Sequence, residues 1–526
     1  MNETTIPRKH SEVERLDLKP LDWGGGTPAC RSSVGAESGS ATKRLEVNPR
    51  HRGDMFARFL ALSVSLAGVA VFGADPAAAP RPNIVFVLVD DLRWDDLSIT
   101  GNTVAKTPHL DRVAREGVLF RNAFATTVIC SPSRANILTG RQTRAHGIVD
   151  NTDRSAASHK LATFPQALQR AGYETAFVGK WHMGNDDTRR PGFDHWVCLK
   201  GQGSTYDPEL NVNGQSLNAK GYVTDILGER AVEFLKSKHT KPFLLYYSHK
   251  AVHPETIQRA DGSLSDPTLS NFIPAERHKT LYAGAKIPRR PNALAAPEGK
   301  PALQRPIANL PPLGPKTGSS DEVILNRLRM LAAIDESMGE LFKVLEATGQ
   351  LERTLIVVTS DHGYFYGEHG LSVERRLAYE EGIRIPLFFR YPALIKAGSR
   401  RNQMALTVDF APTFMEIAGA PVPSGLHGKS LLPLLRENGP ALRESFLIEH
   451  FSESVFPRTT KMGYQAIRTE AWKYIHYVDI PNADELYDLN RDPYELRNLI
   501  GSAGHAAELA KLKAELARHV AASGPR

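Results

Sequence analysis

Three runs of apolar residues, each followed at once by polar residues, constrain the fold more than any other feature of the chain. The first run is "IVFVLV" at 84–89, and "PFLLYYSH" (242–249) and "TLIVVTSDHG" (354–363) repeat the pattern. Strands that are apolar on both sides are typical of a parallel sheet whose two faces are covered by helices. The sequence therefore predicts an α/β protein with a mostly parallel sheet.

Stretches with helical spacing lie between these strands and support the same fold class. They occur at 107–117, 163–172, 225–237 and 321–349. Strands that alternate with helices favour a doubly wound sheet, in which ligands bind beyond the carboxyl ends of the strands. Because polar residues follow all three apolar runs, we expect a functional site at that edge of the sheet.

The remainder of the chain divides into two further regions. Residues 255–320 are rich in proline and polar residues with little periodicity, so we expect an irregular excursion that shapes a substrate pocket. After about residue 420 the pattern changes to short strands, as in "AIRTEAWKYIHYV", and a final helix in "HAAELAKLKAELARHVAAS". We predict a catalytic domain at 80–425 and a smaller C-terminal α+β subdomain at 426–526.

The first 80 residues contain a pattern typical of export. A short basic start at Met55 precedes an apolar run at 59–73, and small residues follow it. This is the order of a secretory signal peptide, and the run is shorter than the roughly 20 residues of a membrane span. We expect a signal peptide at 55–79, translation from Met55, and a mis-assigned or disordered extension at 1–54. A signal anchor with a cytoplasmic tail is the alternative, and the predicted location is periplasmic or secreted.

Charge and cysteine content argue against several classes of protein. The net charge of +7 is spread along 526 residues without a basic run or zinc-finger spacing, so we expect no nucleic-acid partner. A mildly basic chain suits an anionic substrate equally well. The cysteines are Cys30, Cys130 and Cys198, and their wide spacing predicts neither a disulfide framework nor a cysteine metal site. We expect Cys198 to serve packing.

Acidic residues at two of the strand ends indicate a metal site. Asp90 and Asp91 follow the first apolar run, and Asp361 follows the third. Clustered carboxylates repel one another unless a cation lies among them, and hard oxygen ligands suit Ca²⁺ or Mg²⁺. Taken alone, Asp90 and Asp91 favour a helix cap or a turn over a metal site. The second acidic strand end makes the metal site the favoured interpretation.

Basic residues and histidines occur near the same strand ends. Lys180 and His182 are two residues apart in "VGKWHMG", so both project to one side if the segment is extended, although a plain turn is the alternative. His253 in "SHKAVHPE" is the candidate proton donor to a leaving group, and Arg375 lies near the strand that ends at Asp361. A metal with several cations suits a multiply oxygenated anionic ester, either phosphate or sulfate.

Cys130 does not fit this chemistry as an ordinary thiol, because a soft sulfur ligand is mismatched with a hard divalent cation. Its surroundings, "CSPSRANILTGR", resemble the sulfatase signature Cys-x-Pro-Ser-Arg-x-x-x-Leu-Thr-Gly. Further segments match the pattern of the sulfatase family in the family's order, over about residues 82–500: "NIVFVLVDDLRWDDL", "GKWHMG", "SHKAVH", "TSDHGYFYGEHGL", "YEEGIRIPL" and "RTEAWKYI".

The resemblance implies an alkaline-phosphatase-like fold and a formylglycine-dependent sulfatase. A separate formylglycine-generating enzyme would oxidise Cys130, and a hydroxyl of the hydrated aldehyde would attack the sulfur of a sulfate ester. Such a covalent route divides one difficult displacement into two steps. The implied calcium ligands are Asp90, Asp91, Asp361, His362 and the modified Cys130.

The resemblance also implies roles for the remaining site residues. Arg134 and Lys180 would hold the formylglycine. His182 would assist the release of sulfate, and His253 would contact the sulfate and protonate the departing alcohol. Arg375 stands where the family usually has lysine. A guanidinium keeps the positive charge but is a poorer proton donor, so a role in protonating the leaving group is in doubt.

The substrate and the competing functions are less constrained. "SHKAVH" together with "FIPAERH" resembles exported bacterial sulfatases that act on sulfated sugars, so a glycan sulfate is favoured over an aryl sulfate. A phosphonate or phosphate ester hydrolase of the same superfamily is an alternative, because that branch also has a histidine beside a metal-binding aspartate. A catalytically dead carbohydrate-binding protein is the third possibility. It would be marked by loss of Cys130, Arg134 or a metal aspartate, and all are present.

Overall fold

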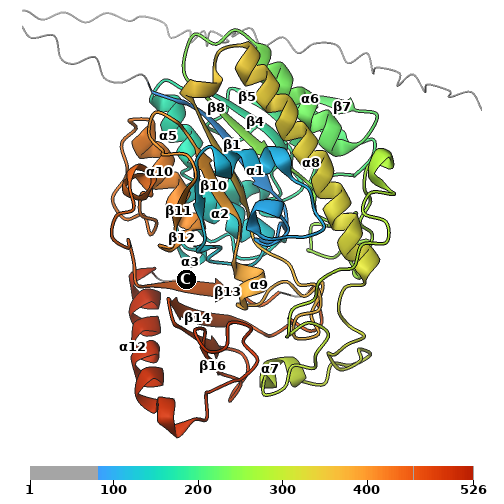
Figure 1. The fold of residues 1–526 in the computed structure, drawn as a ribbon, viewed down its shortest axis with the longest axis vertical. Helices are drawn as coiled ribbons and strands as arrows, with labels where there is room; N and C mark the ends of the chain where they lie inside the picture. Colours follow the sequence, from blue (N-terminus) through green and yellow to red (C-terminus); the bar gives the residue numbers. More distant parts are fainter. Residues whose placement is uncertain (1–80, 454, 525–526) are drawn as a thin grey trace, which may run out of the picture. The chain divides into compact units, whose positions relative to one another are not determined.

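A ten-stranded sheet is the main element of the computed structural model, which describes residues 81–453 and 455–524 (Figure 1). The predicted signal peptide at 55–79 and the segment 1–54 lie outside the described residues. Neighbouring strands are parallel throughout the centre of the sheet. In spatial order the central strands are β9 (Thr354–Ser360), β1 (Asn83–Val89), β8 (Phe243–Ser248) and β4 (Glu174–Lys180).

The predicted apolar runs form β1, β8 and β9, in which every residue is buried. Shorter strands extend the sheet on both sides, and several of them are antiparallel. Beyond β4 lie β5 (His195–Leu199), β6 (Glu209–Val212) and β7 (Gln215–Asn218). Beyond β9 lie β10 (Leu387–Arg390), β2 (Val118–Phe120) and β11 (Ser399–Arg401). The sheet is therefore mixed but mostly parallel, as predicted.

Helices cover both faces of this sheet, which confirms the doubly wound arrangement. Adjacent residues of β8 show the alternation, because Tyr246 stacks on Phe164 whereas the hydroxyl of Tyr247 lies 2.7 Å from Ser337 Oγ. One group of helices comprises α1 (Pro108–Arg115), α6 (Val223–Lys236) and α8 (Asp321–Ala347). The other comprises α2 (Cys130–Thr139), α5 (Phe164–Arg170) and α10 (Phe410–Ile417).

The boundaries of the long helices follow from local sequence. At the start of α8, Ser320 Oγ accepts a hydrogen bond from the backbone N–H of Val323, and two acidic residues occupy the first turn. Both features stabilise a helix N-terminus. No helix in the described part of the chain is long and apolar enough to cross a membrane.

The short elements connect these layers. The short α-helices are α3 (Thr143–His146), α4 (Ser155–Ser158), α7 (Pro301–Gln304), α9 (Glu380–Ile383) and α11 (Leu432–Arg436). The 3₁₀ helices are η1 (Ser98–Thr100), η2 (Glu276–His278), η3 (Leu351–Arg353), η4 (Thr407–Asp409) and η5 (Ala503–His505). Two short strands, β3 (Ala123–Phe124) and β12 (Ala405–Leu406), pair with each other.

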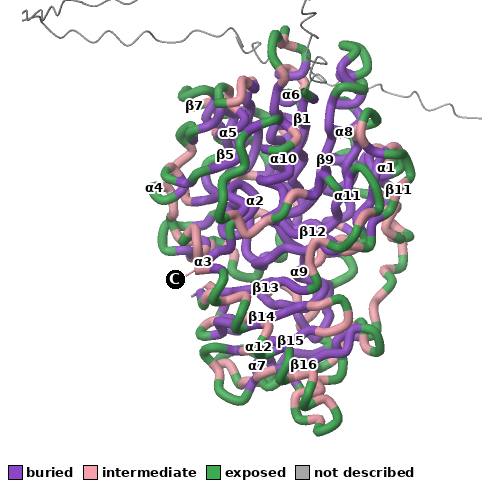
Figure 2. The backbone as a smooth tube through the Cα atoms, turned by 90° about the vertical axis from the view of Figure 1, so that its left-hand side faces the viewer, coloured by how far each residue is buried: buried purple, intermediate pink, exposed green. Residues whose placement is uncertain are grey.

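The excursion at 255–320 is irregular, as predicted, with η2 and α7 as its only helices in the described chain. Exposed and buried residues are mixed along this excursion. The central strands, in contrast, are buried throughout (Figure 2). Gln258 and Lys300 are buried, so parts of the excursion pack into the molecule.

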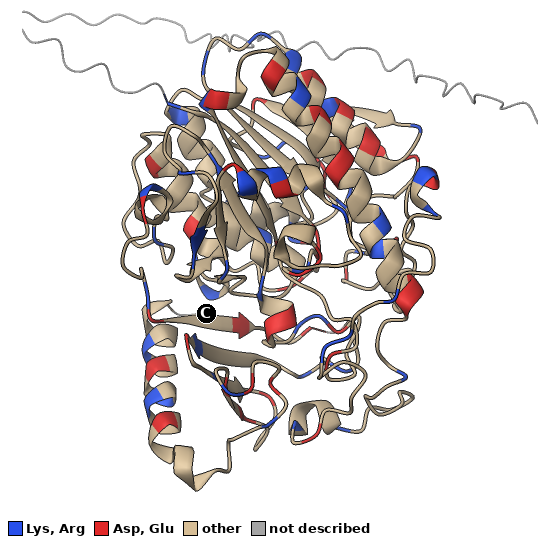
Figure 3. Ribbon diagram, in the orientation of Figure 1, with Lys and Arg blue, Asp and Glu red and all other residues tan. Residues whose placement is uncertain are grey.

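A second, antiparallel sheet and a helix form the C-terminal part, which confirms its α+β character. Leu512 and Leu516 of the helix pack on the sheet, whereas Lys, Arg and Glu lie along the same helix (Figure 3). The backbone N–H of Glu449 donates to the Thr126 carbonyl at 3.1 Å, so this sheet contacts the segment that leads to Cys130. Its elements are β13 (Ser445–His450), β14 (Tyr464–Thr469), β15 (Trp472–Tyr477), β16 (Glu485–Asp488) and α12 (Ala506–Ala522).

Candidate active site

The carboxyl ends of β1 and β9 bring three buried carboxylates together. The two strands pair in register, with Val89 opposite Ser360, so Asp90 and Asp361 leave the sheet side by side. The backbone N–H of Asp91 donates to Asp361 Oδ1 at 3.1 Å. Asp91 has a left-handed φ of 60°, which is uncommon outside glycine and is concentrated at functional sites. All three aspartates are buried.

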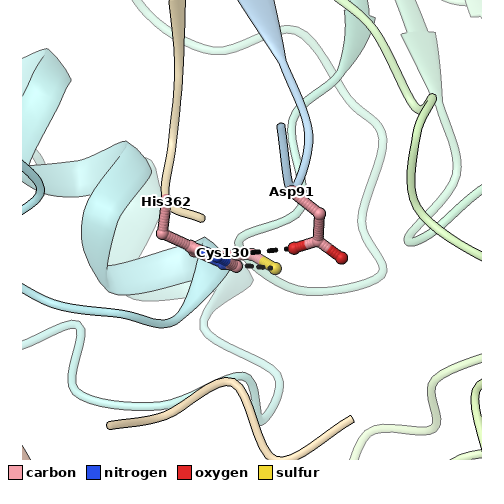
Figure 4. A group of neighbouring side chains, drawn as sticks. All are labelled: Asp91, Cys130 and His362. Atoms are coloured by element: carbon pink, nitrogen blue, oxygen red, sulfur yellow. Dashed lines mark hydrogen bonds and ion pairs between the residues drawn. The ribbon is translucent and has the colours of Figure 1, made fainter. Parts of the chain in front are cut away.

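Helix α2 presents Cys130 to these strand ends, because the helix begins at that residue. Ser133 Oγ donates to the carbonyl of Asp361 at 2.6 Å and ties the first turn of α2 to the end of β9. The Sγ atom of Cys130 lies 3.5 Å from His362 Nε2, and His362 Nδ1 lies 3.4 Å from Asp91 Oδ1 (Figure 4). The cysteine and the predicted metal ligands are therefore neighbours.

Cys130 and His362 form a coupled acid–base pair. Burial and Asp90 act to raise the pKa of the Cys130 thiol, but Lys180 and His362 outweigh them and the pKa is lowered. Burial opposes protonation of His362, but the negative charges of Asp361 and Cys130 raise the pKa of its imidazole to about 9. Each of the two groups thus shifts the pKa of the other toward its charged form.

The donor atoms fit a divalent metal ion. Two overlapping sets of residues could hold the ion, Asp91–Cys130–His362 and Asp90–Cys130–Asp361. Within each set, the ligand atoms lie within 4.8 Å of one another. Asp91 Oδ2 is buried without a hydrogen-bond partner among the described residues. Burial and the Asp90 carboxylate raise the pKa of Asp361 to about 8. Asp90 and Asp361 thus repel each other here, and carboxylate oxygens are the preferred ligands of hard divalent cations.

Arg134 and Lys180 contact the carboxylates of the candidate metal site. Arg134 Nε donates to Asp361 Oδ2 at 3.1 Å, and its terminal nitrogen donates to Ser248 Oγ and the Lys180 carbonyl, both at 2.8 Å. Lys180 Nζ donates to Asp90 Oδ2. Burial opposes ionisation of Asp90, but Lys180 and Arg134 hold the pKa of its carboxyl well below the usual range. Both cations therefore stabilise ionised ligands beside Cys130.

Lys180 and His182 reach the site by a different route from the one that their spacing suggested. Strand β4 ends at Lys180, and His182 has a left-handed φ of 54°, so the segment is not extended. Ser131 Oγ donates to the His182 carbonyl at 2.5 Å, which ties the turn to the start of α2. A turn, and not an alternation of side chains along a strand, places both residues beside Cys130.

Gln258 is a site residue that the sequence did not reveal. Its Oε1 lies 2.7 Å from His182 Nε2, and its Nε2 donates to the Gly262 carbonyl at 3.0 Å, which orients the amide. The amide of Gln202 donates to the same Oε1 at 3.1 Å. His182 Nε2 must therefore carry the proton. Its Nδ1, which is buried without a hydrogen-bond partner in the described chain, is left as an acceptor.

The protonation state of His182 is consistent with that orientation. Burial and the nearby Lys180 lower the pKa of His182 well below its ordinary value, so the ring is neutral near pH 7. A neutral imidazole with an unused lone pair can accept a proton. No sequence signal could have identified Gln258, because it lies in the aperiodic excursion 76 positions from its histidine.

His253 and Arg375 form a pair that touches the metal ligands. His253 Nδ1 lies 2.9 Å from the Pro254 carbonyl and donates to it, so Nε2 accepts from Arg375, also at 2.9 Å. Arg375 Nε donates to Asp91 Oδ1 at 2.9 Å. Burial, Lys180 and Arg375 lower the pKa of His253 well below its usual range, although Asp90 acts in the opposite direction. The pair thus connects a neutral histidine to a metal-ligand carboxylate.

All ten predicted residues lie in this one buried region, and their charges suit an anionic substrate. The charged side chains are three carboxylates and three cations, namely Asp90, Asp91, Asp361, Arg134, Lys180 and Arg375. A divalent cation added to this balanced set would leave it positive and attract an anion. Neutral His182 and His253 complete a set suited to displacement at a tetrahedral oxyanion ester.

Comparison with protein families agrees with this chemistry. Residues 82–420 match the family model described as Sulfatase. Residues 367–522 match the model described as N-sulphoglucosamine sulphohydrolase, C-terminal.

Individual relatives cover most of the chain. N-acetylglucosamine-6-O-sulfatase of Bacteroides thetaiotaomicron is 34% identical over 499 residues, which cover 82% of this chain and 85% of that protein. N-acetylglucosamine-6-sulfatase of Homo sapiens is 28% identical over 82% of this chain and 83% of its own. A solved structure in complex with its substrate D-glucosamine-2-N,6-O-disulfate superposes with a TM-score of 0.72 at 32% identity, over 84% of this chain and 98% of that one.

Proposed function

This chain belongs to the sulfatase family, and from that premise we propose that its substrate is the sulfate ester of an amino sugar of the glucosamine type. As a sulfatase it hydrolyses a sulfuric ester to an alcohol and inorganic sulfate. The observation that carries the substrate class is its 34% identity, over 82% of the chain, to an N-acetylglucosamine-6-O-sulfatase. The similarity to a structure with a sulfated glucosamine bound supports the same class.

We propose that Cys130, once converted to formylglycine by a formylglycine-generating enzyme, is the nucleophile. The converted residue would supply a hydroxyl nucleophile, and the metal ion would stabilise developing negative charge. Conversion also replaces sulfur by oxygen, which makes the donor set uniformly hard apart from His362 and supports Ca²⁺ as the ion. Arg134 and Lys180 would keep Asp90 and Asp361 ionised and in place around it.

Proton transfer is assigned to the two neutral histidines. His182 would accept a proton at Nδ1, since Gln258 occupies Nε2. His253 would donate a proton to the departing alcohol from Nε2, because a bound sulfate anion favours the protonated form of the ring. Arg375 donates to Nε2 of the neutral His253 in the free enzyme, and it would turn to the sulfate and neutralise its charge once that nitrogen is protonated. Its guanidinium does not deprotonate in proteins, so it is not assigned a proton.

The location and domain limits are part of the proposal. An exported protein, periplasmic or secreted, is supported by the signal-peptide pattern at 55–79. A division near residue 425 is supported by the change from the mixed sheet to the antiparallel one. The formylglycine-generating enzyme is the expected partner during maturation.

The test begins with protein made in a host that has formylglycine-generating activity. Conversion of Cys130 should lower the mass of the tryptic peptide Asn122–Arg134 by about 18 Da. The rate of ester hydrolysis is then measured with N-acetylglucosamine 6-sulfate, 4-nitrophenyl sulfate and a phenyl phosphonate ester, as release of sulfate from the first two and of phenol from the third. We expect the sugar sulfate to have the highest kcat/KM. A preference for the aryl sulfate or the phosphonate would replace the proposed substrate class with one of those alternatives.

A further inference from the structure

A buried polar cluster adjoins the active site where the C-terminal sheet approaches it. It consists of Arg376, His450 and Glu453 and is called the Arg376 cluster below. Arg376 Nε donates to Glu453 Oε1 at 2.9 Å. The three side chains are buried, although they come from the segment after Arg375 and from the end of β13 and its following loop.

Each member of the Arg376 cluster has polar atoms that its neighbours leave unused. One terminal nitrogen of Arg376, Oε2 of Glu453 and both ring nitrogens of His450 have no hydrogen-bond partner within the described ranges. Buried polar groups are normally paired, and leaving them unpaired is unfavourable. An ion pair with unused polar atoms, together with a buried histidine on which the charge of Arg376 acts, therefore indicates a place prepared for a ligand.

One cavity is lined both by Glu453 of the Arg376 cluster and by residues that bond neighbours of the catalytic groups. It has a volume of about 300 Å³, and Glu453, Asn151 and Gly262 are among the residues that line it. Asn151 Oδ1 accepts from the backbone N–H of Ser131, the neighbour of Cys130, at 3.0 Å. The Gly262 carbonyl accepts from Gln258, which holds His182. A ligand in this cavity would therefore contact the residues that bond Ser131, the neighbour of the nucleophile, and Gln258, the partner of the proposed base.

The charge of the Arg376 cluster distinguishes it from the sulfate site. One guanidinium and one carboxylate cancel, and burial lowers the pKa of His450 to about 3, so the imidazole is neutral. A balanced set of donors and acceptors has no preference for a second anion. It suits hydroxyl groups, each of which donates and accepts, and the cavity is at the lower end of the range for small-molecule sites.

We infer that the Arg376 cluster binds ring hydroxyl groups of the sugar whose sulfate enters the catalytic site, and thereby selects a sugar over an aryl sulfate. The inference rests on the proposed function. It assigns to the C-terminal sheet a direct part in substrate recognition through Glu453.

The test compares two substrates on matched variants. Glu453→Gln keeps the size of the side chain but removes the carboxylate acceptor. We expect its kcat/KM for N-acetylglucosamine 6-sulfate to fall at least about tenfold further than its kcat/KM for 4-nitrophenyl sulfate, because a buried hydroxyl loses its partner. The control is Glu470→Gln, a change at an exposed residue of the β14–β15 turn, which should leave the ratio at the wild-type value.

A second measurement needs no variant and covers the case in which Glu453→Gln does not fold. Wild-type enzyme is assayed with the 3-deoxy and 4-deoxy analogues of the sugar sulfate. A loss of about tenfold or more with at least one analogue supports the inference. Equal rates on all three sugars overturn the inference. It is also overturned if Glu453→Gln lowers kcat/KM equally for the sugar sulfate and the aryl sulfate. If the wild type does not prefer the sugar sulfate over the aryl sulfate, the proposed function fails and the inference falls with it.

Discussion

Two buried charge networks lie in this molecule, and they differ in how fully their polar atoms are paired. At the catalytic edge, Asp91 Oδ2 has no partner in the described structure, and the pKa of Asp361 is raised to about 8 by burial and Asp90. In the second network Glu485 accepts hydrogen bonds from three tyrosine hydroxyls at 2.5 to 3.2 Å. The tyrosines are Tyr379, Tyr477 and Tyr487.

The second network, called the Glu485 cluster here, joins the C-terminal sheet to the segment that begins α9. Close to it, Lys473 Nζ lies 2.9 Å from Glu380 and 2.7 Å from Glu495. Because both networks are buried and charged but differ in their hydrogen-bond pairing, burial of charge alone does not mark a functional site. A network whose acceptors are filled by its own neighbours stabilises the fold, whereas one with unfilled acceptors is arranged for a ligand.

The largest expected effect follows from replacing Cys130 by alanine. Sulfate release should fall at least about a thousandfold, because the nucleophile is removed. Stability should change little, since the only side-chain hydrogen bond of the thiol within the described part of the chain is the 3.5 Å contact with His362. Sulfate release and the thermal midpoint are measured together. Activity close to wild type would exclude Cys130 as the nucleophile.

The next effect tests whether the catalytic network is held for a metal and not for stability. Asp361→Asn should lower turnover by about a hundredfold or more, because a metal ligand is weakened. In the presence of a chelator the variant should be at least as stable as the wild type, because it removes one of the mutually repelling buried carboxylates. Thermal unfolding with and without added Ca²⁺ measures this. A metal-free variant that unfolds well below the wild type would show that Asp361 serves the fold.

A smaller effect is expected from the residue that orients His182. Gln258→Leu should lower kcat about tenfold, because the histidine loses the acceptor that fixes its tautomer. Gln258→Glu keeps an acceptor, and its negative charge raises the pKa of His182. His182 then stays protonated, and inactive as a base, up to a higher pH. The acidic limb of the kcat–pH profile should therefore move to higher pH. An unshifted profile, with both variants equally impaired, would indicate a structural role only.

The smallest effect on turnover is expected in the Glu485 cluster. Glu485→Gln should destabilise the fold by about 2 kcal/mol, since three buried hydroxyls lose a charged acceptor. Turnover per folded molecule should stay within about threefold of the wild type, because the hydrogen bonds that the Glu485 carboxylate makes in the described structure go to tyrosines outside the ten site residues. Denaturant unfolding and an active-site titration separate the two quantities. A large loss of turnover at unchanged stability would reverse the assignment of the two networks.

Most of the fold and nearly all of the proposed catalytic residues could be predicted, because their signals are local. A short segment of sequence is enough to reveal the apolar runs of β1, β8 and β9 and the helical spacing of α8. The short strands β2, β6, β7, β10 and β11 could not be predicted, since segments of three or four residues carry too little periodicity. Gln258 and Glu453 were missed for a related reason, as both lie in loops.

The chemical groups that this protein carries follow from the sequence alone: a modifiable cysteine, three carboxylates, three cations and three histidines in a recognisable order. Where the protons of those groups lie depends on the tertiary structure. His182 receives its orientation from a residue 76 positions away, and Arg375 meets His253 across 122 positions. Tautomers and pKa values depend on contacts and burial, which form only when distant segments pack together.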